Sequence, residues 1–293
     1  MGTLLEKLTK VDFTNLDKIL YTKHKITKTQ IIKYYIKIAP LMLKFLKNRP
    51  LVTTRFPDGV EKKGFYEKNA PKGKPTWVQT YKHYSKTSKR NIHYILANNL
   101  DTLLWLANLA ALEIHIPLST TQSPQKPDII LFDIDPEPPA NIQDAIKVAK
   151  ILKKTLTDHY SLKAYPKTSG KKGLHVLVPV IPEHEYKKTK EFVHNIGKKL
   201  KKENEIVVSE FSQSQKPGTV YIDYAQNSSG RTMICPYSLR ATPDATVSTP
   251  LTWKELEKGL KPQNFNISNV LERKNNPWKD FWTIKQKLDL KET

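Results

Sequence analysis

The sequence predicts a mixed α and β fold, either α+β or α/β, with a sheet whose strand ends face a cleft. Apolar runs of strand length alternate along the chain with amphipathic patterns of helical period. Apolar residues make up 38% of the 293 residues, which is enough for a sizeable core and argues against global disorder. A chain of this length forms one large domain or two small ones.

The first half of the chain is expected to contain helices and a β-hairpin. Residues 26–39 carry apolar side chains at helical spacing, and Pro40 is expected to interrupt or kink this helix. Residues 51–69 predict a hairpin around a Pro-Asp-Gly turn. A second helix is expected to run from a cap at Asp101 through Glu113, and a short strand follows it.

Residues 117–128 are polar and proline-spaced, so we expect them to join two halves of the chain. The second half alternates strands and helices more evenly, and its second helix has a strongly basic outer face. Thr252 and Glu255 predict a capping box that opens a short helix. The expected strands cover 127–135, 173–180 and 219–226, and the expected helices cover 141–156 and 185–202.

Net charge and cysteine content narrow the classes of function. Lys and Arg number 49 against 28 Asp and Glu, and the net charge of +21 favours nucleic acid, an anionic membrane surface or another polyanion as partner. The single cysteine, Cys235, excludes a disulfide framework and a CxxC zinc site, and it fits a reducing cytosol. The most apolar window, 103–116, is too short to span a bilayer, and the first residues lack a secretion signal.

Two aspartates lie at the end of the apolar strand 127–135. Side chains alternate along a strand, so Asp133 and Asp135 point to one face and Ile134 points to the other. Two like charges at this spacing repel each other unless a cation such as Mg²⁺ or Mn²⁺ lies between them. The alternative is that both carboxylates lie on a solvated edge or cap the following loop.

A third acid favours the metal interpretation. Asp223 ends an apolar run in the strand expected at 219–226, and a polar loop follows it. Three inward carboxylates from two strands can hold two metal ions for in-line phosphoryl transfer. One ion would activate the attacking oxygen and the other would neutralise the triphosphate.

A glycine-containing turn lies between these acids in the sequence. Ser169, Gly170 and Gly173 form a flexible turn that carries Lys171 and Lys172 and leads into a strand. Glycines let backbone N–H groups approach phosphate oxygens, and the lysines and the serine supply charge and a hydroxyl. A Walker A loop leads into a helix, so this turn is a different kind of site. The alternative is an ordinary basic hairpin turn.

Arginines and histidines provide weaker signals. Arg231 and Arg240 follow the third acid and are two of only six arginines, whose guanidinium group suits phosphate. A structural arginine that bridges a carboxylate would give the same pattern. His115 and His175 end or enter apolar strands, where a histidine is more often a core or supporting residue than a ligand.

The ordered set of motifs resembles the primase-polymerase domain of bacterial ligase D and its stand-alone relatives, within the archaeo-eukaryotic primase superfamily. The resemblance covers about residues 12–285, and the order of the motifs makes it far more specific than one Asp-x-Asp. Arg231 departs from the pattern, because the family usually has a lysine there. The segments are LDKILY, ITKTQIIKYY, TRFPDGVEKKGFYEKNAP, LEIHIP, LFDIDP, TSGKKGLHVLVP, VYIDYAQN and PYSLRATPDATVSTPLTWKEL.

This resemblance implies an α+β, archaeo-eukaryotic primase-like fold, with mixed and antiparallel sheets flanked by helices around a central active-site cleft. It implies a single domain over residues 1–293. Within that domain, residues 1–116 would contact the DNA end and the template, residues 125–270 would form the catalytic core, and residues 271–293 would be a peripheral segment.

The resemblance also implies roles for individual residues. The catalytic carboxylates would be Asp133, Asp135 and Asp223, which would bind two divalent ions, Mn²⁺ in preference to Mg²⁺. The expected nucleotide ligands are His115, Ser169, Lys172, His175, Asn227 and Arg240. The expected DNA contacts are Lys18 and Lys28 with a 5′-phosphate, Phe65 and Tyr66 as a stacking pair, and Lys216 with the template.

The implied activity is a template-dependent polymerase that extends 3′-hydroxyl ends at gaps and double-strand breaks during non-homologous end joining. It would use NTPs or dNTPs, with a preference for ribonucleotides. The implied partners are gapped, overhanging or broken DNA, a separate ATP-dependent DNA ligase and a Ku-type protein. The expected location is the cytoplasm, with the nucleoid. No segment resembles a ligase domain or a phosphoesterase domain, so the chain is expected to be a stand-alone polymerase or an excised domain, with sealing supplied by another protein.

Two other functions stay open from the sequence. One is a de novo DNA primase, against which the lack of a recognisable zinc module argues mildly. The other is a non-catalytic protein that binds and bridges DNA ends through its basic surface. The second alternative would leave three clustered acids unexplained.

Overall fold

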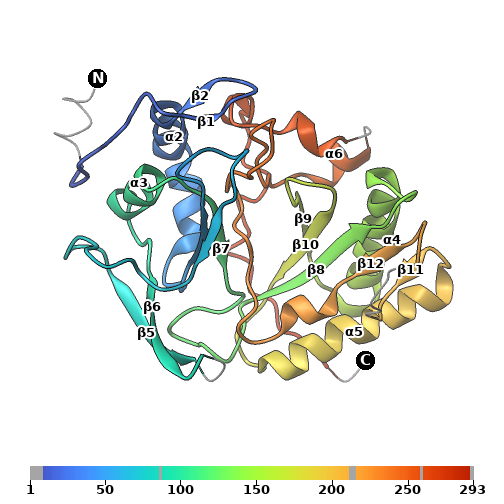
Figure 1. The fold of residues 1–293 in the computed structure, drawn as a ribbon. Helices are drawn as coiled ribbons and strands as arrows, with labels where there is room; N and C mark the ends of the chain where they lie inside the picture. The colour runs from blue at the N-terminus through green and yellow to red at the C-terminus, as the bar shows by residue number, and fades with distance from the viewer. Residues whose placement is uncertain (1–8, 86–87, 211–215, 258–259, 291–293) are drawn as a thin grey trace. The chain divides into compact units, whose positions relative to one another are not determined.

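The computed structural model describes residues 9–85, 88–210, 216–257 and 260–290 (Figure 1). The chain forms two compact units. The first unit contains Met1–Pro117, Ile234–Ser248 and Phe265–Arg273, and the second unit contains Leu118–Met233, Thr249–Asn264 and Lys274–Thr293. The chain therefore leaves the first unit where the polar segment 117–128 begins, and it returns to that unit twice.

The first unit is built on a four-stranded sheet in the order β13-β7-β3-β4. β3 pairs antiparallel with both β4 and β7, so the hairpin predicted over residues 51–69 is confirmed. Two further antiparallel pairs, β1-β2 and β5-β6, belong to the same unit. The strands are β1 (Ile19–Tyr21), β2 (Ile26–Thr27), β3 (Val52–Arg55), β4 (Phe65–Glu67), β5 (Thr80–Ser85), β6 (Arg90–Ile95), β7 (Ala111–Ile116) and β13 (Met233–Ile234).

Helix α2 (Lys28–Leu46) begins at a capping box and runs through its proline. The Thr27 side chain accepts from the Gln30 backbone N–H, and the Gln30 side chain accepts from the Thr27 N–H. Pro40 is exposed, and buried apolar side chains lie on both sides of it. Of the two expectations at Pro40, the interruption is wrong and the kink stays a prediction. Burial of the apolar face holds the helix together across the one missing hydrogen bond.

Helix α3 (Leu100–Asn108) is shorter than the sequence suggested and starts earlier. Asn99, not Asp101, is the cap, and its side-chain oxygen accepts from the Thr102 N–H at 2.9 Å. Ala110 has a left-handed backbone (φ +55°), which ends the helical path. The residues that follow pair with β3, so Glu113 lies in strand β7 and the prediction that the helix includes it is wrong.

The second unit is built on a five-stranded sheet in the order β11-β12-β8-β10-β9. β11 and β12 are parallel and the other pairs are antiparallel, so the sheet is mixed. Helices α4 (Ile142–Tyr160) and α5 (Tyr186–Glu203) pack against it (Figure 1), which confirms both helix predictions. The strands are β8 (Ile129–Pro136), β9 (Tyr165–Thr168), β10 (Leu174–Pro179), β11 (Val207–Val208) and β12 (Val220–Ile222).

The strand expected at 219–226 is only three residues long. β12 ends at Ile222, and Asp223 caps a short 3₁₀ helix, η1 (Tyr224–Asn227), by accepting from the Ala225 N–H at 2.9 Å. An aspartate at a chain reversal competes for backbone N–H groups and so favours a cap over a continued strand. Asp223 therefore lies directly after the strand.

The remaining short elements complete the two units. The predicted Thr252–Glu255 capping box is confirmed at the start of α6 (Trp253–Glu257). The final segment, expected to be peripheral, contributes the buried rings of Trp278 and Phe281, which stack on each other at 4.9 Å in the second unit. The short 3₁₀ helices η2 (Pro262–Asn264) and η3 (Val270–Glu272) precede it.

No helix in the described part of the chain combines the length and the apolar character that crossing a lipid bilayer requires.

Candidate active site

Three aspartates and one histidine of the second unit form a row, the acidic row, across three neighbouring strands: Asp133 and Asp135 on β8, Asp223 directly after β12 and His175 on β10. β8 runs between β10 and β12, and Asp133 is directly opposite His175 in the antiparallel register. On the other side of β8, Asp135 is opposite Tyr221, and the Asp223 N–H donates to the Asp133 carbonyl oxygen at 2.9 Å. Directly opposed residues of an antiparallel pair share a face. The register therefore brings the three expected carboxylates and His175 to one side of the sheet.

Side-chain contacts hold this row in place. His175 Nε2 lies 3.3 Å from Asp133 Oδ1, and both side chains are largely buried. Asp223 Oδ1 accepts from the Tyr221 hydroxyl at 3.3 Å. Burial, followed by the charge of Asp223, raises the pKa of Tyr221 well above its ordinary value, so this hydroxyl remains a hydrogen-bond donor.

Gly173 fits closely against Asp135. A Cβ atom added to Gly173 would lie 2.5 Å from Asp135 Oδ1 and 2.6 Å from the Ile134 carbonyl oxygen. Both distances are shorter than contacts that real Cβ atoms make, so only glycine leaves this carboxylate where it is. Close packing against Asp135 therefore requires glycine at position 173, independently of the role of Gly173 in the turn.

The ligand chemistry of the row suits a hard divalent cation. Asp133, Asp135 and Asp223 supply carboxylate oxygens, which Mg²⁺ and Mn²⁺ prefer, and Gly173 leaves space for the Asp135 group. Within the described ranges, no group of three His, Cys, Asp or Glu side chains is close enough to enclose a metal ion. The three aspartates fit such an ion by ligand type and by their shared face, although their side chains do not enclose an ion site in this structure.

The turn between β9 and β10 is closed by Ser169. Its hydroxyl oxygen accepts from the N–H groups of Gly173 at 3.2 Å and Lys171 at 3.3 Å. Gly170 has φ +77°, a conformation that favours glycine. Lys171 and Lys172 are exposed, and Lys172 Nζ lies 3.7 Å from Glu137 Oε2. The turn therefore presents two lysines from a backbone that the serine organises.

Asn227 is fully buried, and its amide bonds both backbone polar groups of Leu131 on β8. Its Nδ2 donates to the Leu131 carbonyl oxygen at 2.7 Å, and its Oδ1 accepts from the Leu131 N–H at 3.0 Å. These contacts tie η1 to β8 and so fix the position of Asp223. Lys216, expected at the template, is exposed in the same unit.

The expected stacking residues of the first unit lie on opposite faces of its sheet. Tyr66 is opposite Thr54, which is opposite Glu113, so these residues share one face across β4, β3 and β7. Phe65 points to the other face, where the Arg55 guanidinium lies 5.0 Å from its ring centre. Phe65 and Tyr66 are 44% and 54% exposed, so both rings are accessible although they face opposite ways.

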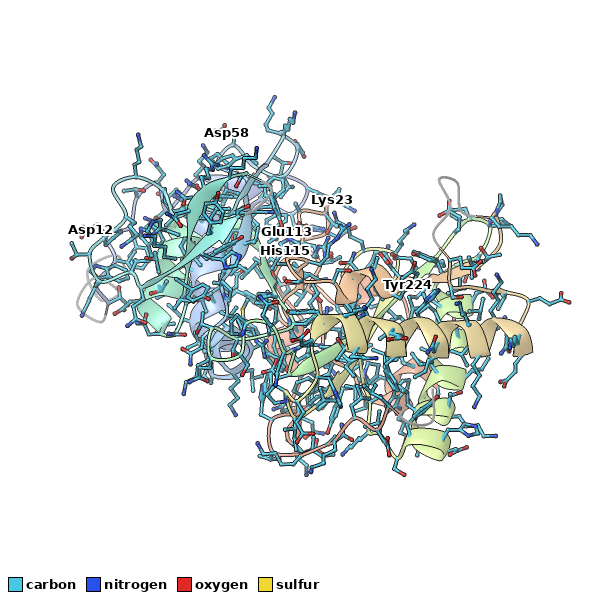
Figure 2. All side chains as sticks on the ribbon, turned by 90° about the horizontal axis from the view of Figure 1, so that it is seen from below. Asp12, Lys23, Asp58, Glu113, His115 and Tyr224 are labelled. Atoms are coloured by element: carbon cyan, nitrogen blue, oxygen red, sulfur yellow. The ribbon has the colours of Figure 1, made fainter. Side chains whose placement is uncertain are left out.

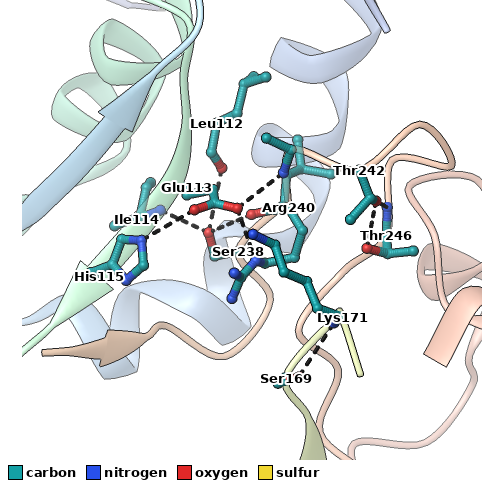
Figure 3. A network of polar contacts seen from close by, with 12 residues as sticks. Leu112, Glu113, Ile114, His115, Ser169, Lys171, Ser238, Arg240, Thr242 and Thr246 are labelled. Carbon is teal, nitrogen blue, oxygen red and sulfur yellow. Dashed lines mark hydrogen bonds and ion pairs between the residues drawn. The ribbon is translucent and has the colours of Figure 1, made fainter. Parts of the chain in front are cut away.

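His115 and Arg240 meet at one buried carboxylate. Arg240 Nε donates to Glu113 Oε1 at 3.0 Å, and His115 Nε2 lies 3.4 Å from Glu113 Oε2 (Figure 3). Figure 2 shows Glu113 and His115 as neighbours in the first unit, and the ring of Tyr66 packs edge-on to His115 at 6.3 Å. The sequence left open that Arg240 is a structural arginine that bridges a carboxylate. The contact of Arg240 with Glu113 is of this kind.

Glu113 is the residue that sequence reasoning missed. The sequence predicts it at the end of a helix, but it precedes His115 by two residues, and alternation along a strand puts both side chains on the same face. An acid inside the apolar run 111–116 was the available signal. It is the same signal that identified Asp133 and Asp135.

The two expected 5′-phosphate lysines adjoin the start of α2. The Lys28 N–H donates to the Lys18 carbonyl oxygen at 2.9 Å, and Lys28 Nζ donates to the Thr14 carbonyl oxygen at 2.8 Å. Lys18 Nζ is 3.0 Å from Asp58 Oδ1, and Asp58 is labelled at the surface in Figure 2. Burial, followed by the nearby charge of Lys18, lowers the pKa of Lys28 from its ordinary value of 10.5.

Comparisons with known proteins indicate the class of this protein first and its family second. The fold is the archaeo-eukaryotic primase fold, as the sequence predicted, and the class is a polymerase of the nucleotidyltransferase type. The model of the family described as "LigD, primase-polymerase domain" matches residues 27–282, and the chain belongs to this family.

Two relatives and one solved structure illustrate the likeness. The bifunctional non-homologous end joining protein LigD of Bacillus subtilis (strain 168) is 36% identical over 266 residues, which cover 90% of this chain and 42% of that protein. The multifunctional non-homologous end joining protein LigD of Mycolicibacterium smegmatis is 32% identical over 257 residues, covering 86% of this chain and 33% of that protein. This chain thus spans less than half the length of these relatives.

The solved structure is the polymerase domain of Mycobacterium tuberculosis ligase D in complex with DNA. It superposes with a TM-score of 0.83 at 30% identity, and the match covers 90% of this chain and 94% of that one. The likeness therefore extends over nearly all of that polymerase domain.

Proposed function

We propose that this chain is a template-dependent polymerase that adds nucleotides to 3′-hydroxyl ends at gaps and double-strand breaks during non-homologous end joining. The observation that carries the proposal is the row formed by Asp133, Asp135 and Asp223 on one face of a sheet, in a chain of the LigD primase-polymerase family. Ribonucleotides are the preferred substrates, and Mn²⁺ is preferred over Mg²⁺.

The acidic row is the proposed holder of two divalent ions. When bound, such ions supply charge neutralisation for a triphosphate and lower the pKa of the attacking hydroxyl. His175 orients the Asp133 carboxylate through the contact at 3.3 Å. Asn227 acts as a support for Asp223, because its amide is bonded to the β8 backbone and not directed at a ligand.

Cationic side chains are the proposed binders of the nucleotide's phosphates. Lys172 lies on the Ser169 turn, and its pairing with Glu137 is exposed, so a phosphate can replace that carboxylate at little cost. Ser169 acts through the turn, whose N–H groups it holds. Arg240 and His115 are the proposed contacts to the triphosphate and the sugar, and stabilisation of developing charge on phosphate oxygens is their contribution to the rate.

The start of α2 is the proposed pocket for a 5′-phosphate on the downstream strand. A helix N-terminus attracts anions because its first N–H groups and its dipole point outward. No acidic side chain lies in the first turn of α2, and Lys28 is the first residue of the helix. The lowered pKa of Lys28, caused by burial and by Lys18, is expected where two cations are held together for an anion.

The proposed 5′-phosphate pocket is tested by measuring the binding of gapped duplexes with and without a 5′-phosphate on the downstream strand. The variant combines Lys18→Ala with Lys28→Met, where methionine keeps the buried stem of the lysine. We expect it to bind both duplexes equally, whereas the wild type prefers the phosphorylated one. Lys150→Ala with Lys154→Ala, on the exposed side of α4, removes the same charge and is the control. An equal loss on both duplexes would reduce Lys18 and Lys28 to general electrostatics.

The basic surface and the relatives support a cellular role at broken DNA. A separate ATP-dependent DNA ligase and a Ku-type protein are the proposed partners, because the relatives are named as non-homologous end joining proteins. The proposed location is the cytoplasm, with the nucleoid. Co-purification of the chain with DNA ends, a ligase and a Ku-type protein is the direct test of these partners.

The proposed polymerase activity is tested by extension of a gapped duplex. NTP and dNTP pools are supplied separately, each with Mn²⁺, with Mg²⁺ or with neither. We expect templated addition that requires a metal ion and is faster with NTPs and Mn²⁺. Synthesis without any primer would favour a de novo primase, and DNA binding without addition under every condition would favour a bridging protein.

A further inference from the structure

We propose that Glu113 is a positioning residue for the incoming nucleotide. Its buried carboxylate holds His115 and Arg240 as one recognition unit. The inference deepens the proposed function and rests on it, because it concerns the two nucleotide contacts of the first unit. Glu113 itself touches no substrate in this proposal and acts through its two neighbours.

The first step of the argument is the set of contacts at the carboxylate. Glu113 Oε1 accepts from Arg240 Nε at 3.0 Å and from the Ala241 N–H at 3.1 Å. Glu113 Oε2 lies 3.4 Å from His115 Nε2. Its side chain is only 8% exposed, so these contacts lie in a low-dielectric environment where each is stronger than in water (Figure 3).

The second step is that the strand carrying Glu113 has little freedom. The Ser238 hydroxyl oxygen accepts from the Ile114 N–H at 2.9 Å. The Ile114 carbonyl accepts from the Cys235 N–H at 2.9 Å, and the Leu112 carbonyl accepts from the buried Tyr35 hydroxyl at 3.2 Å. The backbone on both sides of Glu113 is therefore anchored, so the carboxylate imposes its position on its partners.

The third step is what this contact does to Arg240. A guanidinium is planar and carries five donors in a rigid arrangement. Fixing its Nε edge against Glu113 therefore sets the plane in which the remaining donors lie. The main chain of Arg240 is also held, because the Tyr21 hydroxyl donates to its carbonyl oxygen at 3.0 Å. Both ends of the residue are positioned before any phosphate arrives.

The fourth step is that the Glu113 network serves the binding of the nucleotide and not the binding of the DNA. Glu113, His115 and Arg240 form one contiguous network in the first unit (Figure 3). The ring of Tyr66 packs on His115. The 5′-phosphate lysines belong to separate contacts at the start of α2. Loss of the Glu113 charge is therefore expected to weaken nucleotide binding and to leave binding of the DNA unchanged.

The experiment is a double-variant cycle with Glu113→Gln and Arg240→Ala. Binding of ATP with Mn²⁺ and the steady-state KM and kcat for templated ATP addition are both measured. We expect Glu113→Gln to weaken ATP binding and raise KM about tenfold, the usual size of a lost hydrogen bond to a charged group, with kcat changed far less. In the Arg240→Ala background the same change is expected to weaken ATP binding by less, because only the contact with His115 remains to be lost.

The matched control is Glu67→Gln, which removes a carboxylate paired with Arg55 in the same sheet at 3.3 Å. It is expected to leave ATP binding unchanged. Thermal unfolding of each variant separates positioning from folding, and Glu113→Asp, which keeps the charge on a shorter side chain, replaces Glu113→Gln if the latter does not fold.

Unchanged ATP binding in Glu113→Gln, or an equal loss with and without Arg240, would overturn the positioning role. A wild-type chain that binds ATP and extends no primer would overturn the polymerase proposal alone. In that case, tenfold weaker ATP binding by Glu113→Gln would still support the role of Glu113.

Discussion

The Asp223 N–H donates to the Asp133 carbonyl oxygen at 2.9 Å, and this bond brings carboxylates from two separate strands to the same level of one sheet. His175 lies opposite Asp133 on the other side of β8. Asp133 is therefore the central member of the row, with a partner on each neighbouring strand. A change at Asp133 should affect the chemistry more than a change at any exposed acid.

Asp133→Asn is predicted to reduce primer extension about a hundredfold or more, because it removes one negative charge from the proposed ion-binding row while keeping the side-chain volume. The affinity for gapped DNA, measured by fluorescence anisotropy, should stay within about twofold, since the DNA contacts rest on lysines. Lost DNA binding with normal extension per bound molecule would contradict this assignment.

Gly173→Ala is predicted to reduce extension by about a hundredfold, since a methyl group at 2.5 Å from Asp135 Oδ1 must displace that carboxylate. Gly197→Ala is the matched control. Its added methyl group would lie 2.8 Å from Ser209 Cβ, so it also strains the second unit but lies on α5 and not at the acidic row. Both variants are expected to unfold at a lower temperature, and only Gly173→Ala should lose activity per folded molecule.

Tyr66→Ala is predicted to raise the nucleotide KM about tenfold, because stacking of a base on an aromatic ring contributes about 1–3 kcal/mol. Tyr66 shares its face with Glu113 and packs edge-on to His115, whereas Phe65 faces the other way over Arg55. Phe65→Ala should therefore weaken binding of the template strand instead. The opposite result, with Phe65 affecting the nucleotide and Tyr66 the template, would reverse the two assignments.

The capping box of α4 predicts a pH-dependent contribution to stability. A hydrogen bond from the Asn141 N–H, followed by one from Lys147, lowers the pKa of Asp144 from its ordinary value of 3.8. A carboxyl whose pKa is lower in the folded state stabilises the fold above the unfolded-state pKa, and this stabilisation is lost as pH falls through the folded-state pKa. Its contribution is therefore complete above about pH 4 and is lost progressively as the pH falls below that value.

Asp144→Asn is expected to lower the free energy of unfolding by about 0.5–1 kcal/mol at pH 7 and by less near pH 3, where the contribution of the charge is being lost. Denaturant unfolding at the two pH values measures the difference. Asp158→Asn, near the opposite end of the same helix, is the control, because the helix dipole does not favour a negative charge there. A destabilisation that is the same at both pH values would show that Asp144 acts through its shape and not its charge.

The sequence predicted well those features that depend on neighbouring residues. Alternation placed Asp133 and Asp135 on one face, and helical spacing identified α4 and α5, because both periods follow from local backbone geometry. It failed where local signals compete. Asn99 and Asp101 are both good caps, and the apolar run before Glu113 suits a helix until Ala110 adopts a left-handed backbone.

The local residue pattern thus determined which segments form helices and strands and that Asp133 and Asp135 share a face. The net charge indicated an anionic partner, and the order of the motifs indicated the family. Only the tertiary structure decided which distant side chains meet. The register of β8 with β12 brought Asp223 to Asp133, and the sheet of the first unit brought Arg240 to Glu113. The reason is physical: strand register and the pairing of buried polar groups depend on every strand that joins a sheet, and no window of the sequence contains them all.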